Sequence, residues 1–411
     1  MRGTMLGERA GAGPLCTAQR YAALSDVASP ARLRRAMQFD WTEIMKDVDA
    51  QLDGVGLVAH EDVALDPELI ESHARAIAAG RLSKSTSVVS GPIRLAGREH
   101  VENLERASTR ERSELEALGR EAIVRGRVAV AVLNGGMATR FGGDVKGIIE
   151  AVGGRSFLEV KLAQAQRFGR VPFLIMNSFA THARTLQFLA GHQLGDVAEV
   201  FLQSVSLRLT PRGDVFREAS GRVSLYAPGH GDFPGSLRRS GLLARLAERG
   251  VETLLLSNID NLGAELDPLL IGFHLARGRA LTAELAETLP GDVGGAPAFV
   301  GDELQIVEGF RFPAGFDFAR VPFMATNTFA ISLALLEREY PLSWLYVEKQ
   351  VDGRTAVQME RLVNELSSFV PTSYLVTPRG GERGRFFPIK TRADLEALRA
   401  DEALVRRFSG I

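Results

Sequence analysis

The sequence predicts an α/β fold in which a largely parallel sheet is flanked by helices on both sides. From residue 128 onwards, short apolar runs alternate with stretches of helical period, which is the pattern of parallel strands joined by helices. The first run, residues 128–133 (VAVAVL), is apolar throughout and rich in valine, as expected of a strand buried on both faces. A glycine-rich turn follows this strand directly, at the end where open α/β sheets bind their ligands.

The chain before this core is predicted to be mainly helical. Residues 1–36 are rich in Arg, Ala and Gly and lack the apolar segment of a signal peptide, so we expect a flexible extension there. A translation start at Met37 and a transit peptide are the alternatives to this interpretation. Residues 37–126 form the helical N-terminal region, in which the Ser-rich stretch at 83–92 is expected to be extended or a loop.

The last helix of the N-terminal region carries its own boundary signals. Ser108 and Glu111 form a potential capping box at its start, and Gly126 is a typical C-terminal stop. The residues spaced to lie on one face of this helix are Leu115, Leu118 and Ala122.

Strands and helices then alternate through a core at residues 127–335. Strands are predicted at 171–175 and 253–256, and helices at about 183–189 and at 237–249. Asp267 is placed to cap another helix, with Pro268 at its first position and Gly278 at its end.

Two further features complete the organisation of the chain. Residues 298–300 and 304–307 flank a Gly-Asp-Glu turn, which predicts a β-hairpin. Residues 336–411 form a short C-terminal region that carries Lys390.

The composition excludes several classes of function. The formal net charge of −1 gives no reason to expect a nucleic acid or an anionic membrane as partner. No apolar run approaches the ~18 residues that a membrane helix needs. Cys16 is the only cysteine, so an intrachain disulfide and a zinc–thiolate site are both excluded, and a reducing cytoplasm fits.

The glycine-rich turn has the properties of a phosphate-binding loop. Gly135 and Gly136 allow the backbone to come close to a ligand and to present its N–H groups to phosphate oxygens. Arg140 and Lys146 add positive charge to the same loop. The loop fits neither GxxxxGK[ST] nor GxGxxG, so a Walker A motif and a dinucleotide-binding fingerprint are both rejected. An ordinary tight turn is the alternative interpretation.

The turn resembles the GGxGTR signature of nucleotidyltransferases that make UDP-sugars, although Ala138 replaces the third glycine. Further segments of this pattern follow in order: 176–182 (MNSFATH), 202–204 (LQS), 228–232 (PGHGD), 257–264 (SNIDNLGA), 294–295 (GG), 326–327 (TN) and 387–391 (FPIKT). This ordered set is similar to the UTP–glucose-1-phosphate uridylyltransferase (UDP-glucose pyrophosphorylase) family of the eukaryotic type. The resemblance runs from about residue 128 to residue 391, and it implies a Rossmann-like, GT-A-like mixed sheet.

The resemblance implies a reaction in which a sugar-1-phosphate oxygen attacks the α-phosphorus of UTP and pyrophosphate leaves. Such a transfer needs positioning and neutralisation of negative charge, and it needs no covalent nucleophile from the protein. Arg140 and Lys146 are therefore expected to bind the phosphates that leave. By the same resemblance, Lys390 reaches back to these phosphates from the C-terminal region.

The resemblance also assigns a nucleotide-binding set. Gln203 takes the position that reads the uracil edge, and an amide suits uracil because it offers both a donor and an acceptor. His230 is better interpreted as a hydrogen-bond donor to phosphate than as a base, because a phosphate nucleophile is already ionised near neutrality. The full nucleotide-binding set comprises Leu133, Asn134, Gly135, Gly136, Gln203, Gly229 and His230.

The metal and the sugar complete the expected site. Asp260 follows a predicted strand and could hold Mg²⁺, because magnesium needs few carboxylates besides substrate phosphates and water. An Asx turn or a helix cap is the alternative role for this aspartate. Buried sugar hydroxyls need amide or carboxylate partners. The expected sugar-facing set comprises Asn177, Asn258, Asn261, Gly295, Glu308 and Asn327.

We therefore expect a cytoplasmic, Mg²⁺-dependent enzyme of carbohydrate metabolism that uses UTP and a sugar-1-phosphate, with glucose-1-phosphate preferred. A UDP-N-acetylhexosamine pyrophosphorylase is the first alternative, because the Thr139-Arg140 form of the loop is more typical of that branch. A non-catalytic UDP-sugar-binding protein of the same fold is the second, and Ala138 is the feature that favours it. The resemblance does not determine the oligomeric state.

Overall fold

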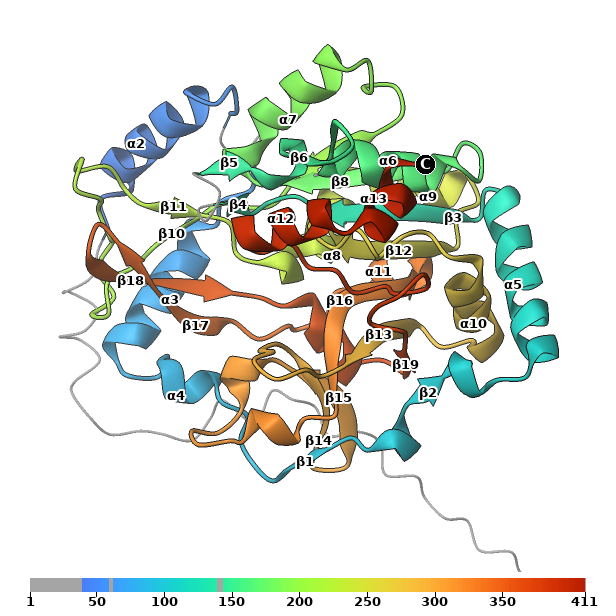
Figure 1. Cartoon of the computed structure of the whole chain (residues 1–411). Helices are drawn as coiled ribbons and strands as arrows, with labels where there is room; N and C mark the ends of the chain where they lie inside the picture. The colour runs from blue at the N-terminus through green and yellow to red at the C-terminus, as the bar shows by residue number, and fades with distance from the viewer. Residues whose placement is uncertain (1–38, 59–61, 139–142, 411) are drawn as a thin grey trace, which may run out of the picture. The chain divides into compact units, whose positions relative to one another are not determined.

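The computed structural model describes residues 39–58, 62–138 and 143–410. The expected extension at 1–36 and Arg140 lie outside the described residues. The central feature is an eight-stranded mixed sheet (Figure 1). In spatial order its strands are β2 (Glu102–Asn103), β19 (Thr372–Val376), β13 (Leu281–Glu287), β16 (Phe323–Ser332), β12 (Thr253–Asn258), β3 (Val128–Leu133), β8 (Phe173–Asn177) and β9 (Glu199–Leu202).

The prediction of a largely parallel sheet is confirmed. All neighbouring strands of this sheet are parallel except at β16, which is antiparallel to both β12 and β13. Because β12 and β13 are both antiparallel to β16, they run in the same direction. Every strand of the sheet other than β16 therefore ends at one edge, and this carboxyl edge is where β3, β8, β9 and β12 lead into predicted site residues.

Strand β3 is buried on both faces, as its unbroken apolar sequence predicts. Alternate residues of β3 belong to two separate hydrophobic cores, one on each face of the sheet. The first core receives side chains from α5 (Thr109–Val124), α6 (Phe157–Gln166), α7 (Phe179–Gly191), α10 (Pro268–Arg277), α12 (Arg392–Ala400) and α13 (Glu402–Ser409). The second core receives them from α8 (Phe233–Arg239), α9 (Leu242–Glu248) and α11 (Leu333–Leu336).

The N-terminal helices pack on a third core at one end of the sheet. Helices α2 (Trp41–Asp53) and α3 (Pro67–Ala78) contact β10 (Ser206–Leu207), β11 (Leu225–Tyr226) and the hairpin of β17 (Leu345–Val351) with β18 (Arg354–Glu360). A small sheet is formed by β1 (Ile93–Leu95), β14 (Ala296–Val300) and β15 (Glu303–Val307). The remaining short elements are α4 (Lys84–Ser87), β4 (Met137–Ala138), β5 (Asp144–Val145), β6 (Glu150–Val152) and β7 (Arg155–Ser156).

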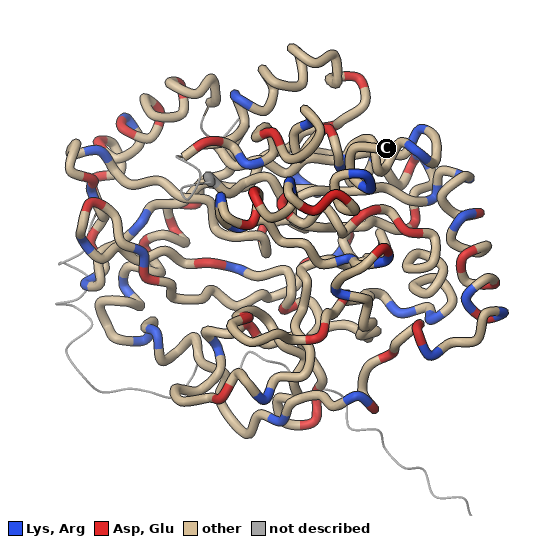
Figure 2. The backbone as a smooth tube through the Cα atoms, viewed as in Figure 1, with Lys and Arg blue, Asp and Glu red and all other residues tan. Residues whose placement is uncertain are grey.

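Predicted helix ends and turns that depend on capping residues or glycine agree with the structure. Asp267 accepts a hydrogen bond from the Leu269 N–H at the start of α10, and Gly278 ends this helix with φ 60°. The predicted hairpin is the antiparallel pair of β14 and β15. Among the helices in the described ranges, none has the length and apolarity needed to cross a bilayer. Acidic and basic residues are interspersed along the described backbone (Figure 2).

Three local predictions are wrong. The single helix expected at 237–249 is two helices, because Gly241 adopts φ 72° and ends the first of them. Leu118 in α5 is 37% exposed, whereas Leu115 and Ala122 are buried. The Ser-rich stretch expected to be a loop contains the short helix α4, in which the Ser83 N–H donates to the Thr86 hydroxyl.

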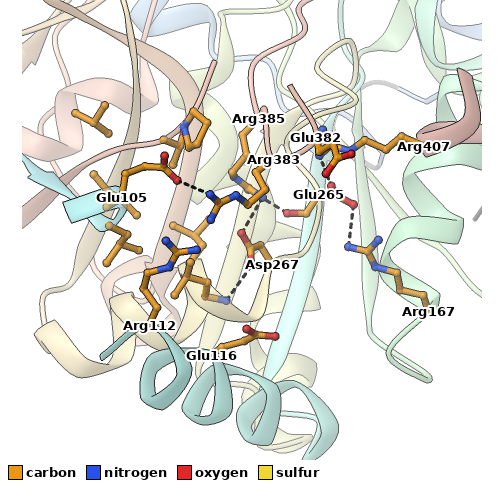
Figure 3. Close-up of a pocket in the computed structure, with 17 residues that line it drawn as sticks. Glu105, Arg112, Glu116, Arg167, Glu265, Asp267, Glu382, Arg383, Arg385 and Arg407 are labelled. Carbon is orange, nitrogen blue, oxygen red and sulfur yellow. Dashed lines mark hydrogen bonds and ion pairs between the residues drawn. The ribbon is translucent and has the colours of Figure 1, made fainter. Parts of the chain in front are cut away.

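A buried ion-pair network attaches the C-terminal segment to the sheet, and Figure 3 shows its members Arg385, Asp267 and Glu265. Arg385 has 6% of its side chain exposed, and its Nε donates to Glu284 Oε2 in β13 at 2.8 Å. Its Nη1 lies 3.3 Å from Asp267 Oδ2, and its Nη2 donates to the Glu265 carbonyl at 3.1 Å. Burial opposes the charge of Arg385, but Glu284 and Asp267 outweigh burial and raise its pKa above the usual value. The network lines a cavity of about 300 Å³, to which Arg407 also contributes.

Arg385→Ala is expected to lower the free energy of unfolding by about 3–5 kcal/mol, because Glu284 would then be buried without a counter-charge. Urea unfolding at pH 7 measures this loss. Arg383→Ala is the matched control, because its pair with Glu105 is exposed and should be worth less than about 1 kcal/mol. The double variant Arg385→Met, Glu284→Leu should recover most of the loss. Equal losses in the Arg385 and Arg383 single variants would contradict the role assigned to this pair.

Candidate active site

The candidate site begins where four neighbouring strands reach the carboxyl edge of the sheet. Asn134 follows β3, Ser178 follows β8, Gln203 follows β9, and Asp260 lies two residues beyond β12. Parallel pairing places Asn258 beside Leu133 and Asn177 beside Leu202. Residues from sequence-distant motifs are therefore brought to one edge by strand register alone.

The glycine-rich turn packs closely against the residue expected to read the base. A Cβ atom on Gly135 would lie 2.4 Å from Gln203 Oε1, which is too close for any other amino acid without a shift. The Gly135 carbonyl also accepts a hydrogen bond from the Ser178 hydroxyl at 2.7 Å. The glycine at this position therefore has a definite physical cause, which is the close approach of the loop backbone to the Gln203 amide.

The Gln203 amide is held in one orientation. Its side chain is buried, and Nε2 donates to the Gly229 carbonyl at 3.1 Å. The Gln203 backbone N–H donates to the Asn177 carbonyl at 2.8 Å. Because a carbonyl can only accept, the amide nitrogen must face Gly229, and Oε1 is left to accept a hydrogen bond from a ligand. An acceptor at this position suits the N3–H of uracil and disfavours cytosine, whose N3 is itself an acceptor.

The turn at 228–232 is fixed by contacts that sequence reasoning missed. Asp232 Oδ2 accepts from the Ser204 N–H at 2.7 Å and from the Ser236 hydroxyl at 2.8 Å. Arg239 Nη2 donates to the Ser204 hydroxyl at 2.7 Å. The aspartate of the Gly-His-Gly-Asp motif thus ties the residue after Gln203 to the turn that holds the Gln203 amide.

His230 is a neutral ring in this structure. Its Nδ1 accepts from the Val363 N–H at 3.0 Å, so the proton of the neutral ring resides on Nε2. Burial lowers the pKa of His230 to about 4. A ring with this pKa is a weak base near neutrality, but its Nε2–H can donate one hydrogen bond.

Lys146 joins the glycine-rich loop to the C-terminal segment. Its Nζ donates to Asp260 Oδ2 and to the Ile389 carbonyl, both at 2.9 Å. The Ile389 N–H in turn donates to the Asp260 carbonyl at 3.0 Å. Lys390, the next residue, is exposed, and its backbone N–H donates to Asp394 Oδ2 at 2.8 Å. Lys146 is thereby bonded to the backbone of the residue before Lys390, and Arg140 lies outside the described residues.

Asp260 has the donor chemistry of a minimal magnesium site. Its carboxylate contacts Lys146 rather than closing an Asx turn. Throughout the described ranges, no three His, Cys, Asp or Glu residues gather to hold a metal ion. Magnesium commonly takes one or two protein carboxylates and fills its other positions with phosphate oxygens and water. Asp260 beside Lys146 fits a metal that arrives with a polyphosphate.

Four of the residues expected to face the sugar form two contacting pairs. Asn327 Nδ2 donates to Asn258 Oδ1 at 2.8 Å, and Asn327 holds a left-handed backbone with φ 58°. A Cβ atom on Gly295 would lie 3.2 Å from Glu308 Oε1, so the glycine lets this carboxylate approach the backbone. Burial raises the pKa of Glu308.

Asn261 has a different set of contacts from the other predicted sugar residues. Its Nδ2 donates to the Arg385 carbonyl at 3.1 Å, and its Oδ1 accepts from the Phe387 N–H at 2.9 Å. The side chain is 1% exposed. In this structure the Asn261 amide attaches the C-terminal segment to the sheet edge.

Several asparagines at the carboxyl edge keep buried polar atoms without a hydrogen-bond partner among the described residues. Asn134 Nδ2 donates to Asn177 Oδ1 at 2.8 Å, and the other polar atom of each side chain has no hydrogen-bond partner among the described residues. The unpaired atoms at this edge are Asn134 Oδ1, Asn177 Nδ2, Asn327 Oδ1 and Asn364 Oδ1. Such groups are rare in folded proteins and mark places where a ligand or water completes the bonding. Asn364 carries no motif signal, and only the tertiary structure places it here.

The sheet and the arrangement at its edge define a Rossmann-like nucleotidyltransferase fold, as the sequence predicts. The family described as UTP–glucose-1-phosphate uridylyltransferase matches residues 93–406. A UTP–glucose-1-phosphate uridylyltransferase of Encephalitozoon cuniculi is 28% identical over 288 residues, which cover 66% of this chain and 57% of that relative. The chain belongs to the UTP–glucose-1-phosphate uridylyltransferase family.

Solved structures agree with this assignment. A UDP-glucose pyrophosphorylase mutant of Leishmania major in complex with UDP-glucose is 26% identical, with a TM-score of 0.59 over 68% of this chain and 67% of that one. A Trypanosoma brucei UDP-N-acetylglucosamine pyrophosphorylase has a TM-score of 0.69 over 92% and 85% of the two chains, but at 19% identity it shows the fold alone. The match covers less than two thirds of the length of the curated relatives, at 57% and 61% for the first two.

Proposed function

We propose that this protein transfers the uridylyl group of UTP to a sugar-1-phosphate, with glucose-1-phosphate preferred, and releases pyrophosphate. The observation that carries the proposal is the junction of Lys146 with Asp260 and Ile389. Lys146 Nζ, from the phosphate loop, lies 2.9 Å from Asp260 Oδ2, a carboxylate oxygen suited to Mg²⁺. It also lies 2.9 Å from the carbonyl oxygen of Ile389, the residue before Lys390. The names of the family and of its curated members support the same reaction.

In this proposal the base and the phosphates are bound by separate parts of the edge. Gln203 Oε1 accepts from the uracil N3–H, and the Gly135–Gly136 backbone lies along the phosphates. Lys146 and Lys390 neutralise the charge that develops as pyrophosphate leaves, which is the main demand of phosphoryl and nucleotidyl transfer. His230 donates from Nε2 to a phosphate oxygen. We also propose that Arg140 acts on the leaving phosphates.

The proposal includes Mg²⁺ as cofactor and a cytoplasmic location. Asp260 and the substrate phosphates would hold the ion, which would add positive charge against the polyphosphate when bound. The single cysteine supports a reducing compartment. The amide and carboxylate groups of Asn177, Asn258, Glu308 and Asn327 would bind the sugar hydroxyls.

Pyrophosphate release from UTP and Mg²⁺ tests the proposal directly. The assay is run in parallel with glucose-1-phosphate, N-acetylglucosamine-1-phosphate and galactose-1-phosphate, and we expect the highest kcat/KM with glucose-1-phosphate. A preference for N-acetylglucosamine-1-phosphate would move the protein to the hexosamine branch. If no acceptor gives pyrophosphate while UDP-glucose still binds, the protein is a non-catalytic UDP-sugar binder.

Lys146→Ala should lower kcat by about 10²–10³, because it removes a fixed positive charge from the developing charge on the leaving group. Steady-state release of pyrophosphate measures the effect, and an unchanged unfolding midpoint shows that the fold is kept. Lys84→Ala is the matched control, because that lysine is 70% exposed and pairs with Glu348 away from the edge. Turnover within twofold of the wild type would remove Lys146 from the mechanism.

Gln203→Ala should reduce the preference for UTP over CTP by about tenfold, which corresponds to one lost hydrogen bond of roughly 1.4 kcal/mol. The preference is measured as the ratio of kcat/KM for the two triphosphates. Gln350→Ala, on the exposed part of β17, is the control. An unchanged ratio in Gln203→Ala would show that the base is read elsewhere.

A further inference from the structure

A short turn in the C-terminal region contributes two neighbouring residues that contact predicted site residues. This turn, the 3₁₀ helix η9 (Val363–Ser368), follows strand β18. The Val363 N–H donates to His230 Nδ1 at 3.0 Å, and Asn364 Nδ2 donates to Glu308 Oε1. The same turn therefore touches the residue expected at the phosphate and the residue expected at the sugar.

The Asn364 side chain is buried with one polar atom left over. It is 1% exposed, and its Oδ1 has no hydrogen-bond partner among the described residues. A Cβ atom on Gly295 would lie 3.2 Å from both Asn364 Nδ2 and Glu308 Oε1, so all three groups meet at one point. A buried carbonyl oxygen normally has a donor, so a ligand group or a water is expected to supply one here.

The orientation of this amide determines which ligand groups fit. Because Asn364 Nδ2 is committed to the Glu308 carboxylate, Oδ1 must point away from it and can only accept. The carboxylate of Glu308 is also an acceptor when it is ionised. Both side chains can therefore accept hydrogen bonds, and the hydroxyl groups of a hexose are donors that suit them.

We propose that Asn364 is a sugar-binding residue that accepts a hydrogen bond from a hydroxyl of the sugar-1-phosphate next to the hydroxyl bound by Glu308. This assignment rests on the proposed function and adds to it a residue outside the recognised motifs. Gly295 lets both side chains approach its backbone, because a Cβ atom there would also lie 2.9 Å from Ile306 Cγ2. The contact to Glu308 gives Asn364 a second effect, because its N–H stabilises the ionised carboxylate that accepts from the sugar.

Deoxy analogues identify the contact. The KM for glucose-1-phosphate is measured beside its 2-deoxy, 3-deoxy and 4-deoxy forms, for the wild type and for Asn364→Ala. We expect Asn364→Ala to raise the KM for glucose-1-phosphate about tenfold while the KM for UTP changes less than twofold. One deoxy analogue should bind the wild type poorly, yet show no further loss in the variant, because the lost hydroxyl and the lost amide are partners. Equal losses for every analogue in both proteins would overturn the assignment.

A control in the same turn separates sugar binding from support of the turn. Ser367 donates from its hydroxyl to the Asn364 carbonyl at 2.6 Å and accepts from the Ile306 N–H at 2.9 Å. Ser367→Ala therefore disturbs η9 without removing the Asn364 amide. An unchanged pattern across the deoxy analogues in Ser367→Ala supports the proposal, whereas the same pattern as Asn364→Ala would show that Asn364 only supports the turn.

The pH profile gives a second readout, which tests whether the sugar is bound by the Glu308 carboxylate that Asn364 contacts. Burial raises the pKa of Glu308, and the other charged groups that act on it are Arg311, Glu360 and Lys390. Asn364→Asp keeps the shape but places a like charge beside Glu308, which raises the pKa of the pair further. Because the sugar needs an ionised acceptor, the acid limb of kcat/KM for glucose-1-phosphate should move to higher pH. An acid limb that stays in place would overturn the proposal.

The failure of this inference can be told apart from a failure of the proposed function. If the wild type releases pyrophosphate and Asn364→Ala equals it in every assay, only the role of Asn364 is wrong. If the wild type is inactive with all three sugar phosphates, calorimetry with UDP-glucose and UDP replaces the kinetics. In that case Asn364→Ala must weaken UDP-glucose about tenfold and leave UDP unchanged, and any smaller difference overturns the inference.

Discussion

The C-terminal part of the site depends on one buried ion pair, between Arg385 and Glu284. This pair returns the C-terminal segment to the sheet after β19, and the segment then reaches Asp260 through the backbone of Ile389. A buried pair of this kind contributes little net stability, because desolvation of both charges offsets their attraction. Its effect is on the position of the C-terminal segment, because Arg385 must stay beside the Glu284 carboxylate. Lys390 follows five residues later along a backbone that Asn261 holds at Arg385 and Phe387 and that Asp260 holds at Ile389.

Charge and neutral polarity are divided along the carboxyl edge. The cations and the carboxylate gather where Lys146 contacts Asp260, whereas asparagines and Gln203 occupy the flanks. Full charges suit a polyphosphate whose own charge they neutralise, and amides suit a base and a sugar, which offer single donors and acceptors. A free amide side chain can donate or accept hydrogen bonds. When a neighbouring carbonyl or carboxylate fixes its orientation, the amide offers a ligand only a donor or only an acceptor. This is how neutral groups can select among ligands of similar shape.

The sequence predicts those parts of the fold whose signals are local. Strand β3, the caps of α10 and the hairpin of β14 and β15 each depend on a few adjacent residues, and all three predictions are confirmed. The break at Gly241 was missed because the apolar pattern continues across it. The insertion of antiparallel β16 and the placement of Asn364 depend on contacts between distant segments, for which spacing along the chain gives no signal. The motif residues could be identified because a resemblance supplied their order. Their hydrogen-bond partners could not be identified in this way.

The pairing of β2 has a consequence for how the chain folds during synthesis. Among the strands of the described residues, β2, at residues 102 and 103, pairs with β19 alone, and β19 begins at Thr372. The sheet therefore cannot be completed until nearly the whole chain has left the ribosome, and until then the open side of β13 has no parallel partner. Pairing over such separations is slow and exposes an unpaired strand edge in the meantime. A nascent chain stalled before Thr372 would present that edge to other chains, so the part of the protein that assembles last is also the part that guards against aggregation.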